Sequence, residues 1–177
     1  MNFLYTLRIL GVLLMIFSTF QFFPMSVAYY YSELALVKVF FNTLIITFLC
    51  GLILYIVSSN RKEDLRTKDG FVITVLFWGV LAIFGSFPIY FAEDIDISYL
   101  DSLFESISGL TTTGATVISG LDELPRSILF YRHLLQWLGG MGIIVLAIAV
   151  LPLLGIGGMQ LYKAETPGPL KDTKLTP

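Results

Sequence analysis

The sequence predicts an all-α integral membrane protein, in which two N-terminal transmembrane helices precede one helix–pore-loop–helix repeat. Hydrophobic residues make up 56% of the chain and charged residues only 14%, whereas soluble domains carry about 25% charged residues. Several apolar runs exceed the roughly 18 residues that indicate a membrane-spanning helix. Between the last two runs lie a short amphipathic segment and a stretch rich in threonine and glycine, "GLTTTGATVISG". These observations, taken in chain order, predict each element.

The first two apolar runs predict a leading transmembrane hairpin within residues 1–60. The first, residues 3–23, is long enough to span and is closed by Pro24. A cleaved signal peptide is the alternative, because "SVA" at residues 26–28 resembles a cleavage site. The run is longer than a typical signal segment, and Arg8 is its only basic residue. The second run, residues 34–58, is a clear span.

Two further runs, residues 71–91 and 128–154, predict the spans of a pore repeat that covers residues 71–158. Basic residues define the orientation, since cytoplasmic connections are enriched in lysine and arginine. The connection at residues 61–70 contains four of them, whereas the other connections before residue 103 contain none. We therefore expect this loop and the tail, residues 159–177, to be cytoplasmic, with both termini inside.

Two arginines conflict with this orientation, because Arg126 and Arg132 would lie on the outer side. Asp122 and Glu123 are close to them in sequence. We expect these two carboxylates to neutralise the arginines locally.

Residues 97–110, "ISYLDSLFESISGL", predict a short helix with apolar residues at helical spacing. Ser98 can cap its start, with Asp101 three residues later. At roughly 20 Å the helix is too short to cross a membrane. It must begin and end on the same side, as a re-entrant pore helix or as an external surface helix. Glu105, if the helix is re-entrant, is an ionisable group inside the membrane and therefore a candidate functional residue.

Residues 111–116, "TTTGAT", favour the re-entrant interpretation, with a turn between helices as the alternative. Backbone at membrane depth needs a partner for its carbonyl groups, and a dehydrated cation is such a partner. The candidate filter residues are Thr111, Thr112, Thr113 and Gly114. Five acidic residues would raise the cation concentration at the outer mouth: Glu93, Asp94, Asp96, Asp122 and Glu123.

The pore repeat, with "SISGLTTTGAT" and "LLQWLGGMGIIVLAIAVLPLLGIGG", resembles the first potassium-channel-like repeat of the Trk/Ktr/HKT superfamily, most closely its TrkH type. The resemblance implies a potassium ion bound through Thr112, Thr113 and Gly114, with Thr111 at the inner end of the filter. A glycine at position 114 is associated with preference for potassium over sodium. It also implies a bacterial inner-membrane location, membrane lipid as surroundings, and no cofactor.

The same resemblance implies a pore of four non-identical repeats in one longer chain, a homodimer of the full-length protein, and a cytoplasmic TrkA-type nucleotide-binding regulatory subunit. This sequence contains one filter-like segment, so it supplies one of four filter walls. We expect it to be the N-terminal part of a longer chain. A homotetrameric cation channel and a non-conducting membrane scaffold are the alternatives.

An enzyme is not expected, because one histidine, one cysteine and scattered carboxylates provide no catalytic set. Three glycines in the last span, Gly139, Gly140 and Gly142, indicate close helix packing, here against the pore helix, or a hinge. Packing is the more common role of small residues in membrane helices.

Overall fold

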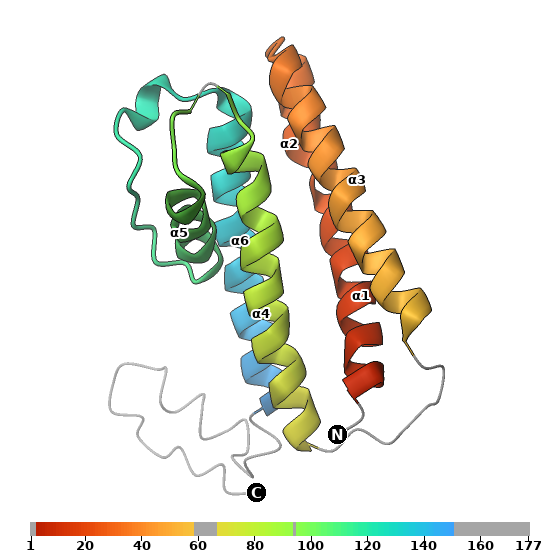
Figure 1. Cartoon of the computed structure of the whole chain (residues 1–177). Coiled ribbons are helices and arrows are strands. Elements are labelled where there is room, and N and C mark those ends of the chain that lie inside the picture. The colour runs from red at the N-terminus through yellow and green to blue at the C-terminus, as the bar shows by residue number, and fades with distance from the viewer. Residues whose placement is uncertain (1–2, 59–66, 94, 151–177) are drawn as a thin grey trace, which may run out of the picture. The chain divides into compact units, whose positions relative to one another are not determined.

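The computed structural model describes residues 3–58, 67–93 and 95–150, and those residues form six α-helices, one short 3-10 helix and no strand. The chain divides into two compact units, residues 1–141 and 142–177. The second unit contains the described end of the last helix, up to Val150. The first unit contains the leading hairpin and the segment predicted as a filter (Figure 1).

The leading hairpin consists of α1 (Phe3–Phe20), α2 (Phe22–Tyr30) and α3 (Leu34–Val57). The sequence predicted that the first span closes at Pro24, but the helical path extends to Tyr30 with a break at Gln21. Pro24 lies in the first turn of α2, where backbone N–H groups have no helical partner and proline is tolerated. We call the end of the unit that carries the α2–α3 turn, Tyr31–Glu33, the turn end; it is at the top of Figure 1.

Helices α1 and α3 approach each other closely at two glycines. A Cβ atom added to Gly11 would lie 2.5 Å from the carbonyl oxygen of Gly51, and one added to Gly51 would lie 2.7 Å from that of Gly11. Small residues allow such backbone contact, which favours helix association in membranes. The hairpin is therefore held by direct contact between the two backbones.

The segment predicted as a pore repeat contains α4 (Thr67–Tyr90), α5 (Tyr99–Leu110), a 3-10 helix (Leu121–Glu123) and α6 (Arg126–Val150). Helix α4 begins at Thr67, inside the connection predicted as a loop over residues 61–70, and α5 begins two residues later than predicted. Helix α6 begins at Arg126 rather than at residue 128. The end of the predicted fourth span, beyond Val150, and the tail at 159–177 lie outside the described residues.

One apolar core joins the hairpin to the pore repeat. Phe40 of α3 contacts Tyr131 of α6, with ring centroids 5.6 Å apart. The Tyr131 hydroxyl also donates a hydrogen bond of 2.8 Å to the carbonyl oxygen of Gly85 in α4. The remaining buried core residues come from all six helices and from Ala92, which follows α4: Phe17, Ala28, Leu36, Leu81, Ala82, Ile89, Ala92, Leu110, Ile128 and Leu135.

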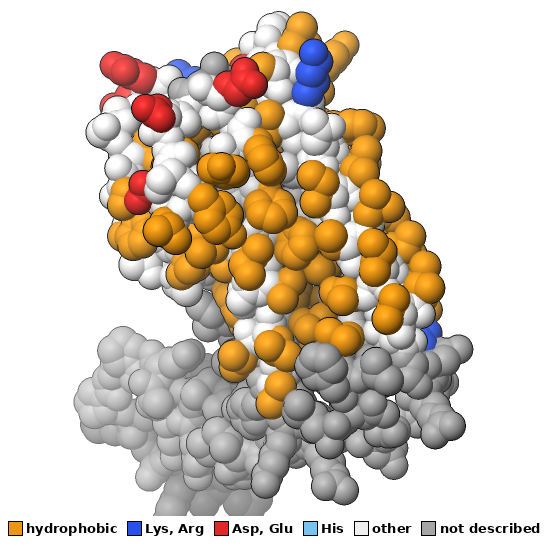
Figure 2. Space-filling view, viewed as in Figure 1, with side chains coloured by type: hydrophobic (Ala, Val, Ile, Leu, Met, Phe, Trp, Pro, Cys, Tyr) orange, Lys and Arg blue, Asp and Glu red, His pale blue; other side chains and the backbone are white. Residues whose placement is uncertain are grey.

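Three helical segments are long and apolar enough to cross a membrane among the described residues: Thr6–Tyr30, Leu34–Val57 and Val72–Tyr90. Apolar side chains cover much of the visible surface of the unit, and acidic side chains gather toward the turn end (Figure 2). Helix α6 has 25 residues, or about 38 Å of helix, so its length also suffices to span. The fold is that of an all-α membrane protein, as predicted.

Candidate functional site

Helix α5 begins at a side-chain cap. The backbone N–H of Asp101 donates to the Ser98 hydroxyl oxygen at 3.2 Å, and the Ser98 hydroxyl donates to the Asp101 carboxylate at 2.7 Å. The chain enters α5 from the turn end of α4, and the segment after α5 returns to that end, where α6 begins (Figure 1). Both connections of α5 therefore lead to the same end of the unit.

Helix α5 places its polar face inside the unit. Ser102, Glu105 and Ser106 are at most 2% exposed, whereas Leu100 is 74% exposed and Ile107 is 44% exposed. The Ser106 side chain is so close to α4 that a Cβ atom on Gly85 would lie 2.6 Å from its hydroxyl oxygen. Leu100, Phe104 and Ile107 thus face outward, whereas Leu110 at the end of the helix is buried in the core. Exposed apolar side chains are expected where the surroundings are lipid or apolar protein.

The segment after α5 turns tightly around the end of the helix. The backbone N–H of Thr112 donates to the Gly109 carbonyl at 2.9 Å, and that of Thr113 donates to the Ser108 carbonyl at 3.0 Å. The Ser108 hydroxyl donates to the carbonyl oxygen of Ala115 at 2.6 Å. The Thr111 and Thr113 hydroxyl oxygens lie 2.8 Å apart. The helix end thereby holds the predicted filter segment at several points.

Two residues of this segment have positive φ angles, Thr112 at 57° and Gly114 at 74°. Glycine adopts this region readily, but a β-branched residue such as threonine rarely does. Backbone conformations of this kind cluster at functional sites, where the surroundings impose them.

The carbonyl groups of Thr111, Thr112, Thr113 and Gly114 accept no hydrogen bond from any residue that the structure describes. Residues 111–117 are all exposed in this chain. A Cβ atom added to Gly114 would meet no atom within 4 Å. The segment therefore consists of exposed residues whose carbonyl oxygens have no partner among the described residues. Such oxygens are suitable ligands for a weakly hydrated cation.

Glu105 connects α5 to the end of the filter segment and to α6. One carboxylate oxygen accepts from the Thr116 hydroxyl at 2.5 Å and from the Val117 backbone N–H at 2.7 Å. The other lies 2.7 Å from Nη2 of Arg132. The Glu105 side chain is fully buried and that of Arg132 is 11% exposed. The Glu105 carboxylate thus holds Thr116 and Val117, where the chain leaves the filter segment, against α5 and α6.

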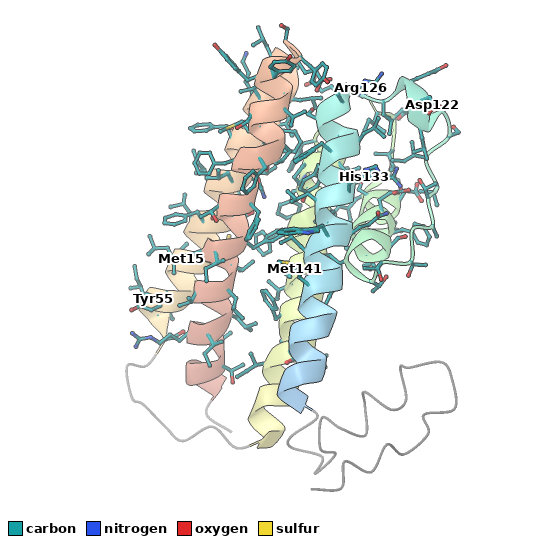
Figure 3. The ribbon with its side chains drawn as sticks, turned by 180° about the vertical axis from the view of Figure 1, so that it is seen from behind. Met15, Tyr55, Asp122, Arg126, His133 and Met141 are labelled. Carbon is teal, nitrogen blue, oxygen red and sulfur yellow. The ribbon has the colours of Figure 1, made fainter. Side chains whose placement is uncertain are left out.

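This arrangement corrects the expectation for the two arginines. Arg132 pairs with Glu105 rather than with Asp122 or Glu123, because α6 carries it alongside the buried face of α5. Arg126 is exposed and, among the described residues, pairs with neither of those carboxylates; its backbone N–H donates to Glu33 at 2.7 Å. Figure 3 shows Arg126 at the start of α6 and His133 about two turns further along.

The contact between Glu33 and the start of α6 was not predicted from the sequence. Its carboxylate also accepts from the backbone N–H of Ser127 at 3.1 Å and from the Ser127 hydroxyl. A carboxylate is favourable at a helix N-terminus, where N–H groups lack partners and the helix dipole is positive. No local sequence pattern could predict this contact, since Glu33 lies 94 residues before Ser127.

The predicted glycines of α6 differ in their surroundings. A Cβ atom on Gly139 would lie 1.9 Å from the Leu110 carbonyl oxygen, so α6 contacts the backbone at the end of α5. A Cβ atom on Gly140 would lie at an ordinary 3.8 Å from a methyl carbon of Thr112. Gly142 is the first residue of the second unit.

The predicted outer-mouth carboxylates do not form one group. Asp96 and Glu123 line a cavity of about 380 Å³ that also contacts Asp101 and the loop after the filter segment, Val117–Gly120. Asp122 is exposed in the 3-10 helix, and Glu93 lines a separate groove beside α3. Asp94 lies outside the described residues.

The profile of the TrkH family, described as cation transport proteins, matches residues 36–177. The chain belongs to the TrkH family. Over 177 residues it is 55% identical to the Trk system potassium uptake protein TrkH of Vibrio parahaemolyticus, covering all of this chain and 36% of that protein. It is 50% identical to the TrkH protein of Escherichia coli K12, again over all of this chain and 36% of the relative.

The crystal structure of the potassium transporter TrkH from Vibrio parahaemolyticus has the same fold. The TM-score is 0.83 at 50% sequence identity, over 93% of this chain and 36% of that chain. The chain thus spans about a third of the length of the TrkH relatives it matches. It is similar to their N-terminal part, and the TrkH family consists of transport proteins rather than enzymes.

Proposed function

We propose that the protein takes part in potassium uptake across a membrane, with Thr111, Thr112, Thr113 and Gly114 forming one of four walls of a selectivity filter. The observation that carries this proposal is the run of exposed residues after α5 whose carbonyl oxygens have no hydrogen-bond partner in the described chain. Exposing carbonyl groups without hydrogen-bond partners to lipid would cost free energy. Beside a pore they replace the hydration shell of a cation.

The local electrostatics also favour a cation. The filter segment begins at the C-terminal end of α5, which carries partial negative charge. Asp96 and Glu123 line a cavity beside the loop that follows. A cation approaching from the turn end would meet these carboxylates before the carbonyl groups.

The relatives support potassium as the ion, because those at 50–55% identity are named potassium uptake proteins of the Trk system. One wall cannot enclose an ion, so three more walls are required. Since the chain spans about a third of its relatives, we propose that they come from further repeats of a longer chain. A homotetramer of this chain is the alternative that the experiment below distinguishes.

We further propose a bacterial inner-membrane location with the turn end outside and both termini in the cytoplasm. The distribution of basic residues supports this orientation. In the Trk system the full-length protein would act as a homodimer with a TrkA-type nucleotide-binding subunit in the cytoplasm.

The test is ion uptake by a potassium-transport-deficient bacterial strain that expresses the chain alone or within its longer protein. Rescue by the longer protein alone supports the four-repeat arrangement, and rescue by the short chain supports a homotetramer. Gly114→Ser should lower the preference for potassium over sodium about tenfold, which equals about 1.4 kcal/mol.

Gly120→Ser is the matched control. Gly120 has a φ of 71°, close to the 74° of Gly114, but lies outside the filter segment. Both substitutions therefore introduce a similar backbone cost of roughly 1–2 kcal/mol. If the two variants change ion preference equally, or if no version rescues uptake despite verified membrane expression, the filter assignment is wrong.

A further inference from the structure

A groove of about 490 Å³ lies on the surface of the unit, between the first half of α3 and the residues that follow α4. It is separate from the filter segment. Its lining includes Lys38, Val39, Asn42 and Ile46 of α3, together with Phe91 and Glu93. The α3 span is the least enclosed of the three apolar spans, with 22% of its apolar window buried. The groove therefore opens on an apolar span that the described residues leave largely uncovered.

The groove runs from the turn end along α3 toward the middle of that apolar span. Lys38 lies one turn from the start of α3 at Leu34, and Glu93 follows shortly after the end of α4 at Tyr90. Both positions belong to the turn end. Ile46 is eight residues beyond Lys38, or about 12 Å deeper along the helix. Polar lining at the turn end is thus continuous with apolar lining further along α3.

The two charged groups of the groove are available for a ligand. Lys38 and Glu93 are exposed, and neither makes a hydrogen bond or an ion pair within the part of the chain that the structure describes. Asn42, one helical turn from Lys38 on the same helix, adds an exposed amide donor. A cation, an amide and an anion around one groove match a headgroup that carries both charges.

We propose that this groove binds a zwitterionic phospholipid with a primary amine, of the phosphatidylethanolamine class. Lys38 and Asn42 donate hydrogen bonds to the phosphate, and Glu93 accepts from the ammonium group. An acyl chain lies along Val39 and Ile46. The Glu93 carboxylate repels purely anionic headgroups such as phosphatidylglycerol, so the groove selects between the two lipid classes by charge.

The test is lipid retention measured by native mass spectrometry on the protein purified from membranes in detergent. Phosphatidylethanolamine and phosphatidylglycerol with the same acyl chains are added separately. We expect tighter binding of phosphatidylethanolamine. Lys38→Gln should weaken the binding of both lipids roughly tenfold, as expected for the loss of one charge-assisted hydrogen bond. Glu93→Gln should weaken phosphatidylethanolamine and strengthen phosphatidylglycerol, which reverses the preference.

Arg126→Gln and Asp122→Asn are matched controls, because both residues are exposed at the turn end and neither lines the groove. Thermal unfolding of each variant verifies that the fold is intact. Equal retention of the two lipids by the unmodified protein, or a Lys38→Gln variant that behaves like Arg126→Gln, would overturn the proposal. The readout does not involve transport, so it is independent of the proposed function.

Discussion

Glu105 of α5 and Arg132 of α6 form a buried ion pair, with 2.7 Å between a carboxylate oxygen and Nη2. The same carboxylate accepts hydrogen bonds from Thr116 and Val117 at the end of the filter segment. The pair therefore joins two helices and one loop. We therefore expect a change at either residue to alter the conformation of the segment proposed as a filter.

Removing the arginine should be strongly destabilising. Arg132→Gln leaves a buried carboxylate without its cation, which typically costs about 3–5 kcal/mol. We expect a lower thermal unfolding midpoint in detergent and loss of potassium uptake. Arg126→Gln is the control, because Arg126 lies on the same helix and is exposed. Equal midpoints for the two variants would show that the pair does not hold α5 and α6 together.

The two roles of Glu105 should be separable. Glu105→Gln retains an acceptor for the Thr116 and Val117 donors but removes the ion pair, whereas Glu105→Leu removes both. We expect unfolding midpoints to fall in that order, and ion preference to change more in the leucine variant. If the leucine variant keeps the ion preference of the unmodified protein, the loop does not depend on this carboxylate.

Gly139 should tolerate no side chain. In Gly139→Ala the added carbon would overlap the Leu110 carbonyl group, so α5 or α6 must shift, at a cost of typically 1–3 kcal/mol. The shift occurs one residue before the filter segment, so we expect reduced uptake as well as reduced stability. Gly79→Ala in α4 is the control, because a Cβ atom there would meet no atom within 4 Å. Comparable uptake by both variants would contradict the prediction.

Glu33 should stabilise the first turn of α6. Glu33→Ala leaves the N–H groups of Arg126 and Ser127 without the acceptor they have now, a loss of roughly 1–2 kcal/mol by analogy with other helix caps. Hydrogen exchange at these two amides should accelerate, while exchange in the middle of α3 stays unchanged. Asp122→Ala serves as the comparison at an exposed carboxylate. Unchanged exchange at Arg126 and Ser127 would mean that the cap contributes nothing.

The orientation can be tested with cysteine labelling in a Cys50→Ser background. A thiol at Ser32, in the α2–α3 turn, should react with a membrane-impermeant reagent added to intact cells. A thiol at Lys62, in the basic connection, should react only after permeabilisation. The reverse pattern would place the turn end in the cytoplasm and invert the assignment of the outer mouth.

Local features of the structure were predictable from sequence because the physical cause is itself local. Ser98 and Asp101 are three residues apart and form the predicted cap. The helical spans follow from hydrophobic runs of sufficient length. The continuation of the first span past Pro24 was not predicted, although proline is compatible with the first turn of a helix.

Contacts between segments that are distant along the chain could not be predicted from the sequence. Arg132 lies near Asp122 and Glu123 along the chain, yet its partner is Glu105, because helix packing rather than sequence distance decides which charges meet. The exposure of Leu100, Phe104 and Ile107 on α5 was not predictable either, since periodicity identifies a face of a helix but not what covers it. The roles of the filter residues stay predictions.

The Glu33 cap has a consequence for biosynthesis. The ribosome completes the leading hairpin before it synthesises Arg126 and Ser127. The Glu33 carboxylate at the hairpin turn therefore has neither of these hydrogen-bond donors until α6 is made. When α6 finally enters the membrane, its first N–H groups meet an acceptor already in position. The hairpin therefore supplies a ready acceptor for the start of the last helix, and we expect a hairpin that carries Glu33→Ala to slow the docking of that helix.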